Sequence, residues 1–148
     1  MSGSLAFVDT NVLLYAYDRT AGEKRARAAA LLKKLWVTRS GALSTQVLQE
    51  FSVNSLRKLN SPLDRESVVR VVRRYAVWPV HRPEPLDIVA ALARSQDHGL
   101  SFWDGLIVQA AVRLDARILY TEDLNPGQRF DGVEVVNPFD VAGNDPRE

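Results

Sequence analysis

Short apolar runs alternate along the chain with longer segments in which apolar residues recur every three or four positions. The short runs predict buried strands, which we expect at residues 5–8, 42–44, 77–80, 117–120 and 133–136. The longer segments predict amphipathic helices, which we expect at residues 11–17, 23–37, 46–59, 65–75, 85–99 and 103–114. Strands that alternate with helices predict an α/β fold in three layers (α/β/α), with helices on both faces of a central parallel sheet.

Short polar residues mark the expected starts of two of these helices. Thr45 precedes the third predicted helix and Asp64 precedes the fourth. Such side chains accept hydrogen bonds from the free N–H groups of a first helical turn, so we expect both residues to be N-caps. Gly99 is placed to end the fifth helix, because glycine readily adopts the left-handed conformation that closes many helices.

The composition removes several classes of site. The chain has 148 residues, of which 46% are hydrophobic and 25% charged, and this suits one globular domain. It has no cysteine and two histidines, which excludes disulfides, cysteine nucleophiles and multi-histidine zinc sites. No stretch approaches the roughly 20 apolar residues of a membrane span, and the start has no basic leader region, so we expect a soluble cytoplasmic protein.

Charge is nearly balanced overall, at a formal +1, but it is unevenly distributed. Residues 19–39 hold seven basic side chains against one acidic, and residues 57–82 hold seven against two. Residues 83–148 hold five basic against twelve acidic side chains. Two basic segments beside acidic ones suit a polyanion held next to a metal site, although lysines and arginines also commonly solvate the outer faces of helices.

Carboxylates fall where this fold would place a site. Asp9 ends the first predicted strand, Asp123 follows the fourth, and Asp104 lies in the first turn of the last helix. Ligands of parallel α/β sheets bind beyond the carboxyl ends of the strands, where Glu50 of the third helix is also expected. Crowded carboxylates need a cation, and oxygen ligands without histidine or cysteine favour Mg²⁺, with Mn²⁺ as the alternative.

Each of these acids also has a purely structural interpretation. Asp9 could cap the helix that follows it, and Asp104 lies three residues after Ser101, close to a capping arrangement. Asp123 belongs to a polar stretch that is typical of a turn, and Glu50 could be an exposed helical glutamate. Spacing alone therefore predicts only a metal-dependent, phosphate-handling site.

Four segments in a fixed order carry a family resemblance. They are 8–15 (VDTNVLLY), 44–51 (STQVLQEF), 101–107 (SFWDGLI) and 119–124 (LYTEDL), with 136–139 (VNPF) as a closing motif. These segments resemble the acidic motifs of PIN domains, in particular the VapC toxins of bacterial toxin–antitoxin modules. The similarity extends over about residues 5–139, so we expect residues 1–148 to form a single PIN domain with short tails.

The resemblance implies a Mg²⁺- or Mn²⁺-dependent endoribonuclease that cleaves structured RNA, often transfer or ribosomal RNA. It implies a cognate VapB-type antitoxin and a homodimer as partners. By position, Asp9 and Asp104 are the principal metal ligands, Asp123 is a further ligand, and Glu50 completes the acidic pocket. The resemblance also implies that hydrogen bonds from three neighbouring side chains orient the carboxylates; these are Thr10, Asn11 and Thr121. Glu122, beside Asp123, is a competing candidate that the motif does not favour.

Two other functions stay open. One is a catalytically silent PIN-like module that binds RNA or a protein; the gathering of four acids argues against it, because unpaired carboxylates packed together repel one another. The other is a phosphatase that forms an acyl phosphate, which needs a second aspartate where this chain has Asn11.

The remaining features suggest binding surfaces. The two basic segments could grip an RNA backbone. Trp36, Trp78 and Trp103 could stack on bases, although all three lie in apolar patterns that favour core packing. The helices of residues 11–37 and 46–59 could form a groove for an antitoxin helix, whose arginine would enter the acidic pocket, or could simply pack in the interior or against a second subunit.

Overall fold

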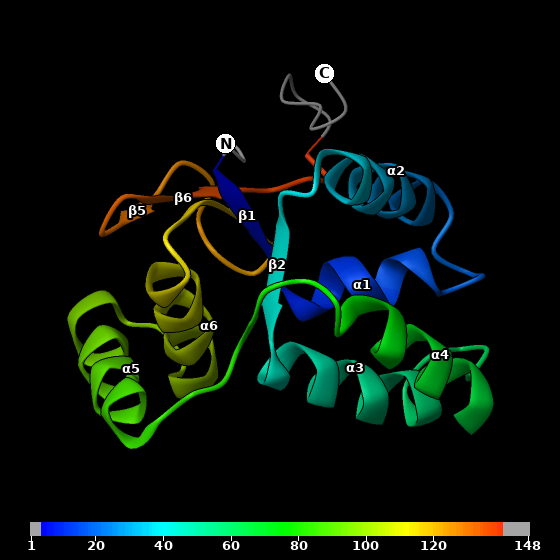
Figure 1. Ribbon diagram of the computed structural model, residues 1–148, viewed down its shortest axis with the longest axis horizontal. Helices are drawn as coiled ribbons and strands as arrows, with labels where there is room; N and C mark the ends of the chain where they lie inside the picture. Colours follow the sequence, from blue (N-terminus) through cyan, green and yellow to red (C-terminus); the bar gives the residue numbers. More distant parts are fainter. Residues whose placement is uncertain (1–3, 141–148) are drawn as a thin grey trace.

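The computed structural model describes residues 4–140 and has a central six-stranded sheet in the order β3-β2-β1-β4-β6-β5 (Figure 1). The strands are β1 (Leu5–Val8), β2 (Gly41–Ser44), β3 (Val80–His81), β4 (Ala116–Tyr120), β5 (Arg129–Phe130) and β6 (Val133–Val136). The helices are α1 (Thr10–Ala16), α2 (Glu23–Thr38), α3 (Thr45–Arg57), α4 (Arg65–Tyr75), α5 (Pro85–His98) and α6 (Phe102–Arg113). This order confirms the predicted three-layer α/β fold.

The sheet is parallel except at one edge. β1 pairs with β2 and β4, β2 with β3, and β4 with β6, all in parallel, as the alternation of strands and helices predicts. β5 pairs with β6 antiparallel through two residues only. This edge strand was not predicted, because two residues are too few to show a periodicity.

Helices cover both sides of the sheet (Figure 1). α6 packs against the sheet with α5 outside it, whereas α1 and α2 lie on the other side. The core between these layers is built from large apolar side chains, and Phe7, Phe51 and Leu119 are fully buried. α5 and α6 approach closely because Gly105 has no side chain: a Cβ added there would lie 2.6 Å from the backbone oxygen of Ala91.

Two local predictions need correction. The N-cap of α3 is Ser44, not Thr45, because Ser44 has the extended backbone of a cap and its hydroxyl accepts a hydrogen bond from Val47 N at 3.3 Å. The third strand covers Val80–His81 rather than 77–80, since Trp78 N still donates to Tyr75 O in the turn that ends α4. Asp64 caps α4 as expected, accepting from Ser67 N at 2.8 Å.

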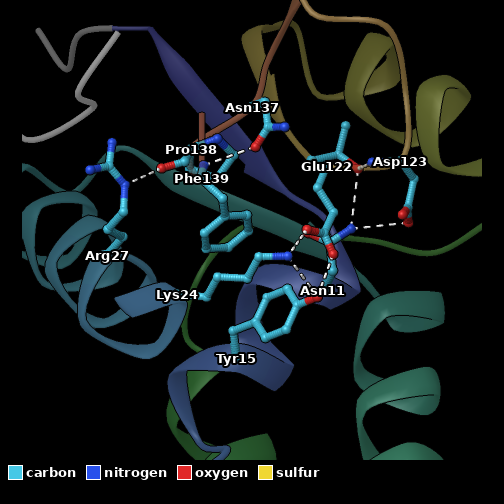
Figure 2. Close-up of polar contacts among 10 residues, drawn as sticks. Asn11, Tyr15, Lys24, Arg27, Glu122, Asp123, Asn137, Pro138 and Phe139 are labelled. Carbon is cyan, nitrogen blue, oxygen red and sulfur yellow. Dashed lines mark hydrogen bonds and ion pairs between the residues drawn. The ribbon is translucent and has the colours of Figure 1, made fainter. Parts of the chain in front are cut away.

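The closing motif near residue 138 is attached to α2. Buried Arg27 donates to the carbonyl oxygen of Pro138 at 2.9 Å, and the Phe139 ring lies edge-on to Tyr15 with centroids 5.0 Å apart (Figure 2). This segment therefore packs against both α1 and α2. Among the helices of residues 4–140, none has both the length and the apolar character that crossing a membrane requires.

Candidate metal centre

Asp9 and Asp123 come together because β1 and β4 are neighbouring parallel strands. Val8 pairs with Tyr120 at the ends of these strands, and Asp9 N donates to Tyr120 O at 3.0 Å. Asp104 reaches the same edge from the first turn of α6. One carboxylate oxygen from each of the three aspartates lies within 4.8 Å of the others. The fold thus brings the three predicted ligands together.

Asp9 is buried and held on both sides. Its Oδ1 accepts from Thr10 N at 2.7 Å and its Oδ2 accepts from the Thr121 hydroxyl at 2.8 Å. It is the N-cap of α1, so the capping interpretation is correct and coexists with the metal-ligand interpretation. Burial raises the pKa of Asp9 to about 7; its two hydrogen bonds lower the pKa, and the charges of Asp123 and Glu50 raise it.

Asp104 and Asp123 are progressively more open to solvent. Partial burial raises the pKa of Asp104, and the charges of Asp123 and Glu50 raise it further. Ser101 caps α6 by accepting from Asp104 N at 3.0 Å, which fixes the backbone beneath the Asp104 carboxylate. Asp123 accepts from Asn11 Nδ2 at 3.0 Å, and its own N–H donates to the Thr121 hydroxyl at 3.0 Å.

Glu50 lies outside the group of three but lines the same hollow, which has a volume of about 240 Å³. Its Oε1 accepts from the Thr10 hydroxyl at 2.5 Å and its Oε2 accepts from Gln46 Nε2 at 3.1 Å. Thr10 therefore contacts Asp9 through its N–H and Glu50 through its hydroxyl. All four acids that the sequence selected border one hollow.

Asn11 and Thr121 connect the two strand ends. Asn11 Nδ2 donates to the Thr121 hydroxyl at 3.2 Å as well as to Asp123, and Thr121 donates to Asp9. Asp9, Asn11, Thr121 and Asp123 thus form one hydrogen-bonded chain. These contacts are of the kind expected for residues that orient carboxylates around a metal ion.

Glu122 is engaged by side chains of α1 and α2 and lies outside the group of three aspartates. Figure 2 shows its carboxylate between Tyr15 and Lys24, accepting from the Tyr15 hydroxyl at 2.5 Å and from Lys24 Nζ at 2.8 Å. The neighbouring Asp123 instead contacts Asn11 (Figure 2). Of the two adjacent acids, Asp123 is the one in the carboxylate group.

The structure adds two residues that sequence reasoning did not place here. Gln46 is 5% exposed and joins Glu50 to α6 by donating to the Trp103 carbonyl oxygen at 3.2 Å. Trp103 borders the hollow with a side chain that is 59% exposed, so its predicted core packing is wrong. Gln46 lies one helical turn before Glu50, and Trp103 directly precedes Asp104. These positions within the selected motifs are the signal that could have identified them.

The donor set fits a hard divalent cation. No lysine, arginine or histidine within residues 4–140 forms an ion pair with Asp9, Asp104 or Asp123. The charge of Asp123 raises the pKa of both Asp9 and Asp104. The three side chains offer oxygen atoms only, which are the ligands that Mg²⁺ and Mn²⁺ prefer.

A second surface lies apart from the carboxylate hollow and shares no lining residue with it. Side chains from the two basic segments meet between α1, α2 and α4, in a groove that is lined by Arg19, Arg25, Arg70 and Arg74. It continues into an aromatic hollow that includes Tyr17, Trp36 and Tyr75. A smaller hollow lies between α1 and α3. Trp78 is buried in the core as expected, and Trp36 is 42% exposed.

Comparison with known proteins agrees with this architecture. The model of the PIN domain family matches residues 6–131. A solved structure described as a toxin–antitoxin complex from Klebsiella pneumoniae aligns with 92% of this chain and 99% of its own, with a TM-score of 0.66. The two sequences are 21% identical, so this likeness concerns the fold. A search of curated proteins returned no match.

Proposed function

This chain belongs to the PIN domain family, and we propose that it is a divalent-metal-dependent endoribonuclease that acts as the toxin of a VapBC-type toxin–antitoxin module. The observation that carries the proposal is the group formed by Asp9, Asp104 and Asp123, whose oxygens lie within 4.8 Å without a cationic side chain among residues 4–140 to neutralise them. Such a group is costly to fold and is typical of a site that holds a metal ion.

Each of the seven polar residues that the sequence selected has a role in this proposal. Asp9, Asp104 and Asp123 hold Mg²⁺ or Mn²⁺, which when bound polarises the scissile phosphate and lowers the pKa of an attacking water. Thr121 and the Thr10 N–H hold the Asp9 carboxylate in one orientation, and Asn11 does the same for Asp123. Glu50 accepts the proton of the attacking water, because no histidine or lysine of residues 4–140 lines this hollow.

The substrate and partners in the proposal follow the family resemblance. We expect transfer or ribosomal RNA as substrate, contacted through its phosphates by basic side chains in the cytoplasm. A VapB-type antitoxin is supported by the similar fold found in a toxin–antitoxin complex. The groove that joins Tyr17, Trp36 and Tyr75 to four arginines suits an apolar partner helix with acidic residues. We also expect the chain to form a homodimer.

The competing function is a silent PIN-like module that binds RNA or protein without turnover. It would use the same basic surface but would gain nothing from three mutually repelling carboxylates. The two functions therefore differ in whether a metal ion binds the acidic group and whether RNA is then cut.

The test is cleavage of labelled RNA in the presence of Mn²⁺ or Mg²⁺. Wild type should cut, whereas Asp9→Asn and Asp104→Asn should lose at least about 100-fold in rate, because each removes a ligand charge while nearly keeping the shape of the side chain. Asp97→Asn, which changes an exposed acid on α5, is the matched control and should cut like wild type. Equal melting temperatures would show that the folds are intact.

Two outcomes would contradict the proposal. Equal cleavage by wild type and both site variants would mean that the acidic group is not the active site. RNA binding without cleavage under any divalent ion would favour the silent module. Sequencing the fragments from total RNA after brief expression would identify the RNA class.

A further inference from the structure

Trp103 occupies an unusual position for a large aromatic side chain. It directly precedes Asp104 in the first turn of α6 and is 59% exposed. Its ring packs edge-on against Phe102, with centroids 5.0 Å apart, and its carbonyl oxygen is held by Gln46 Nε2 at 3.2 Å. The ring is thus presented to solvent from a fixed backbone, next to the metal-ligand candidate.

Trp103 also borders a second hollow. It has a volume of about 430 Å³ and is lined by Gln46, Gln49, Glu50, Val53, Asn54, Lys58 and Trp103. Four of these residues, Gln46, Glu50, Asn54 and Trp103, also line the carboxylate hollow. The two hollows are therefore continuous, and a ligand with its phosphate at the carboxylates can extend into the second one.

The lining combines three kinds of chemistry. Trp103 and Val53, both more than half exposed, offer apolar surface for a flat ring. The amides of Gln49 and Asn54 can donate and accept hydrogen bonds at a polar ring edge. Lys58 supplies a positive charge for a phosphate. Stacking surface, amides and a cation side by side match the parts of a nucleotide.

Gln46 adds an unsatisfied acceptor at the junction of the two hollows. Its side-chain nitrogen donates to Glu50 and to the Trp103 carbonyl, and these contacts fix the orientation of the amide. The Gln46 Oε1 is buried and has no hydrogen-bond partner among residues 4–140. A buried acceptor left without a donor costs about 1–3 kcal/mol, so an N–H or O–H group of a ligand would be stabilising at this point.

We propose that the hollow between Trp103 and α3 binds an unpaired nucleotide of the RNA, adjacent to the phosphate that is cut. The base stacks on Trp103, Gln49 and Asn54 contact its polar edge, and Lys58 contacts the neighbouring phosphate. This inference rests on the proposed function, and it makes the hollow the part of the enzyme that selects the position of the cut.

A first experiment measures binding without cleavage. The probe is a short single-stranded 2′-O-methyl RNA in EDTA, titrated while tryptophan fluorescence is recorded. We expect quenching that disappears in Trp103→Phe, and about 5- to 150-fold weaker binding for Trp103→Ala, the range that loss of one base–aromatic stack gives. Val89→Ala, on an α5 residue that is 60% exposed, is the matched control and should bind like wild type.

A second experiment measures cleavage in Mn²⁺. Trp103→Ala should raise KM and broaden the set of cut positions, Trp103→Phe should restore the wild-type positions, and Mn²⁺ binding by calorimetry should stay unchanged in both. Cleavage by Trp103→Ala at the same positions with the same KM would overturn the inference.

The failures can be told apart. If wild type cuts no RNA but its Trp103-dependent quenching by the probe remains, the proposed function fails and the nucleotide site stands. If the probe leaves the fluorescence unchanged while a partner protein quenches it, the hollow is a protein contact and the inference is wrong.

Discussion

Two adjacent carboxylates on the loop after β4 have different surroundings. The Glu122 side chain lies between Tyr15 and Lys24, which already provide a proton donor and a positive charge. The Asp123 side chain contacts one amide group, from Asn11, and shares its hollow with Asp9 and Asp104. Of the two, only Asp123 is placed to contribute a charge to a bound cation.

This difference gives a prediction for the two amide variants. Asp123→Asn should weaken Mn²⁺ binding by about tenfold or more, because it removes a carboxylate from the group of three. Glu122→Gln should change Mn²⁺ binding by less than about twofold and lower stability by at most about 1 kcal/mol, since the Lys24 pair is partly exposed. Calorimetric titration measures the Mn²⁺ affinity of both variants. A larger loss of affinity in Glu122→Gln than in Asp123→Asn would reverse the assignment.

Sequence reasoning located the acids better than their neighbours. Asp9 and Asp123 follow strands, and Asp104 lies in the first turn of a helix. Residues at these ends of the elements are expected at the edge of the sheet where the strands end, so the sequence predicts that the three acids lie together. Trp103 is different, because an apolar residue in an apolar helix predicts burial. Its exposure depends on where α6 meets α3, a tertiary relation that periodicity does not contain.

At the scale of elements, the close contact between α5 and α6 depends on a glycine, Gly105, at the point where the helices meet. Gly105→Ala should destabilise the protein by about 1–3 kcal/mol, because the added Cβ would meet the Ala91 carbonyl oxygen at 2.6 Å. In an exposed helix the same change would stabilise by about 1 kcal/mol. The sign of the change in melting temperature therefore tests the packing, and a rise would contradict it.

Asp87, a buried acid, connects α5 and α6 to β3 at the edge of the sheet. Asp87 of α5 is fully buried and accepts from Gln109 Nε2 at 3.0 Å and Arg113 Nη1 at 2.8 Å, both on α6. Its Oδ2 accepts from Glu84 N at 2.9 Å and lies 3.2 Å from His81 Nε2 of β3. Burial alone would raise the pKa of Asp87, but these hydrogen bonds and the charges of His81 and Arg113 lower it below 3.8.

This network predicts acid sensitivity. The lowered pKa means that the ionised form of Asp87 stabilises the fold fully above pH 3.8, and that this contribution is lost as the pH falls further. At neutral pH, Asp87→Asn should cost about 2–4 kcal/mol in the free energy of unfolding. Denaturant melts should show that the difference in the free energy of unfolding between wild type and Asp87→Asn becomes smaller below pH 3.8. A difference that stays constant with pH would contradict the assignment.

The bounds of the long elements were predictable, whereas β3 was predicted too early in the chain and β5 was not predicted. Helices with a sustained apolar period, such as α2 and α6, lie within a few residues of their expected bounds. β3 and β5 have two residues each and exist because a longer neighbour, β2 or β6, provides their hydrogen bonds. The cap of α3 fell on Ser44 instead of Thr45 because β2 runs to Ser44 and leaves no residue between strand and helix.

At the scale of the whole molecule, a metal ion would connect parts that are far apart in the chain. Its proposed ligands come from the end of β1, the start of α6 and the loop after β4. Because the ion binds the folded state, Mn²⁺ at 100 times its Kd should stabilise the protein by about 2.7 kcal/mol. Thermal melts should show this shift in wild type and Asp97→Asn, and EDTA should abolish it. A similar shift in Asp104→Asn would place the ion elsewhere.

The pairing of β1 with β4 also has a consequence during translation. Asp9 leaves the ribosome early, but its partner Asp123 is more than a hundred residues later, and the two meet only when the first and fourth strands pair. A nascent chain that ends before β4 therefore lacks one of the three carboxylates of the proposed metal site. The group of three carboxylates is therefore complete only after most of the chain has been made and β4 has joined the sheet.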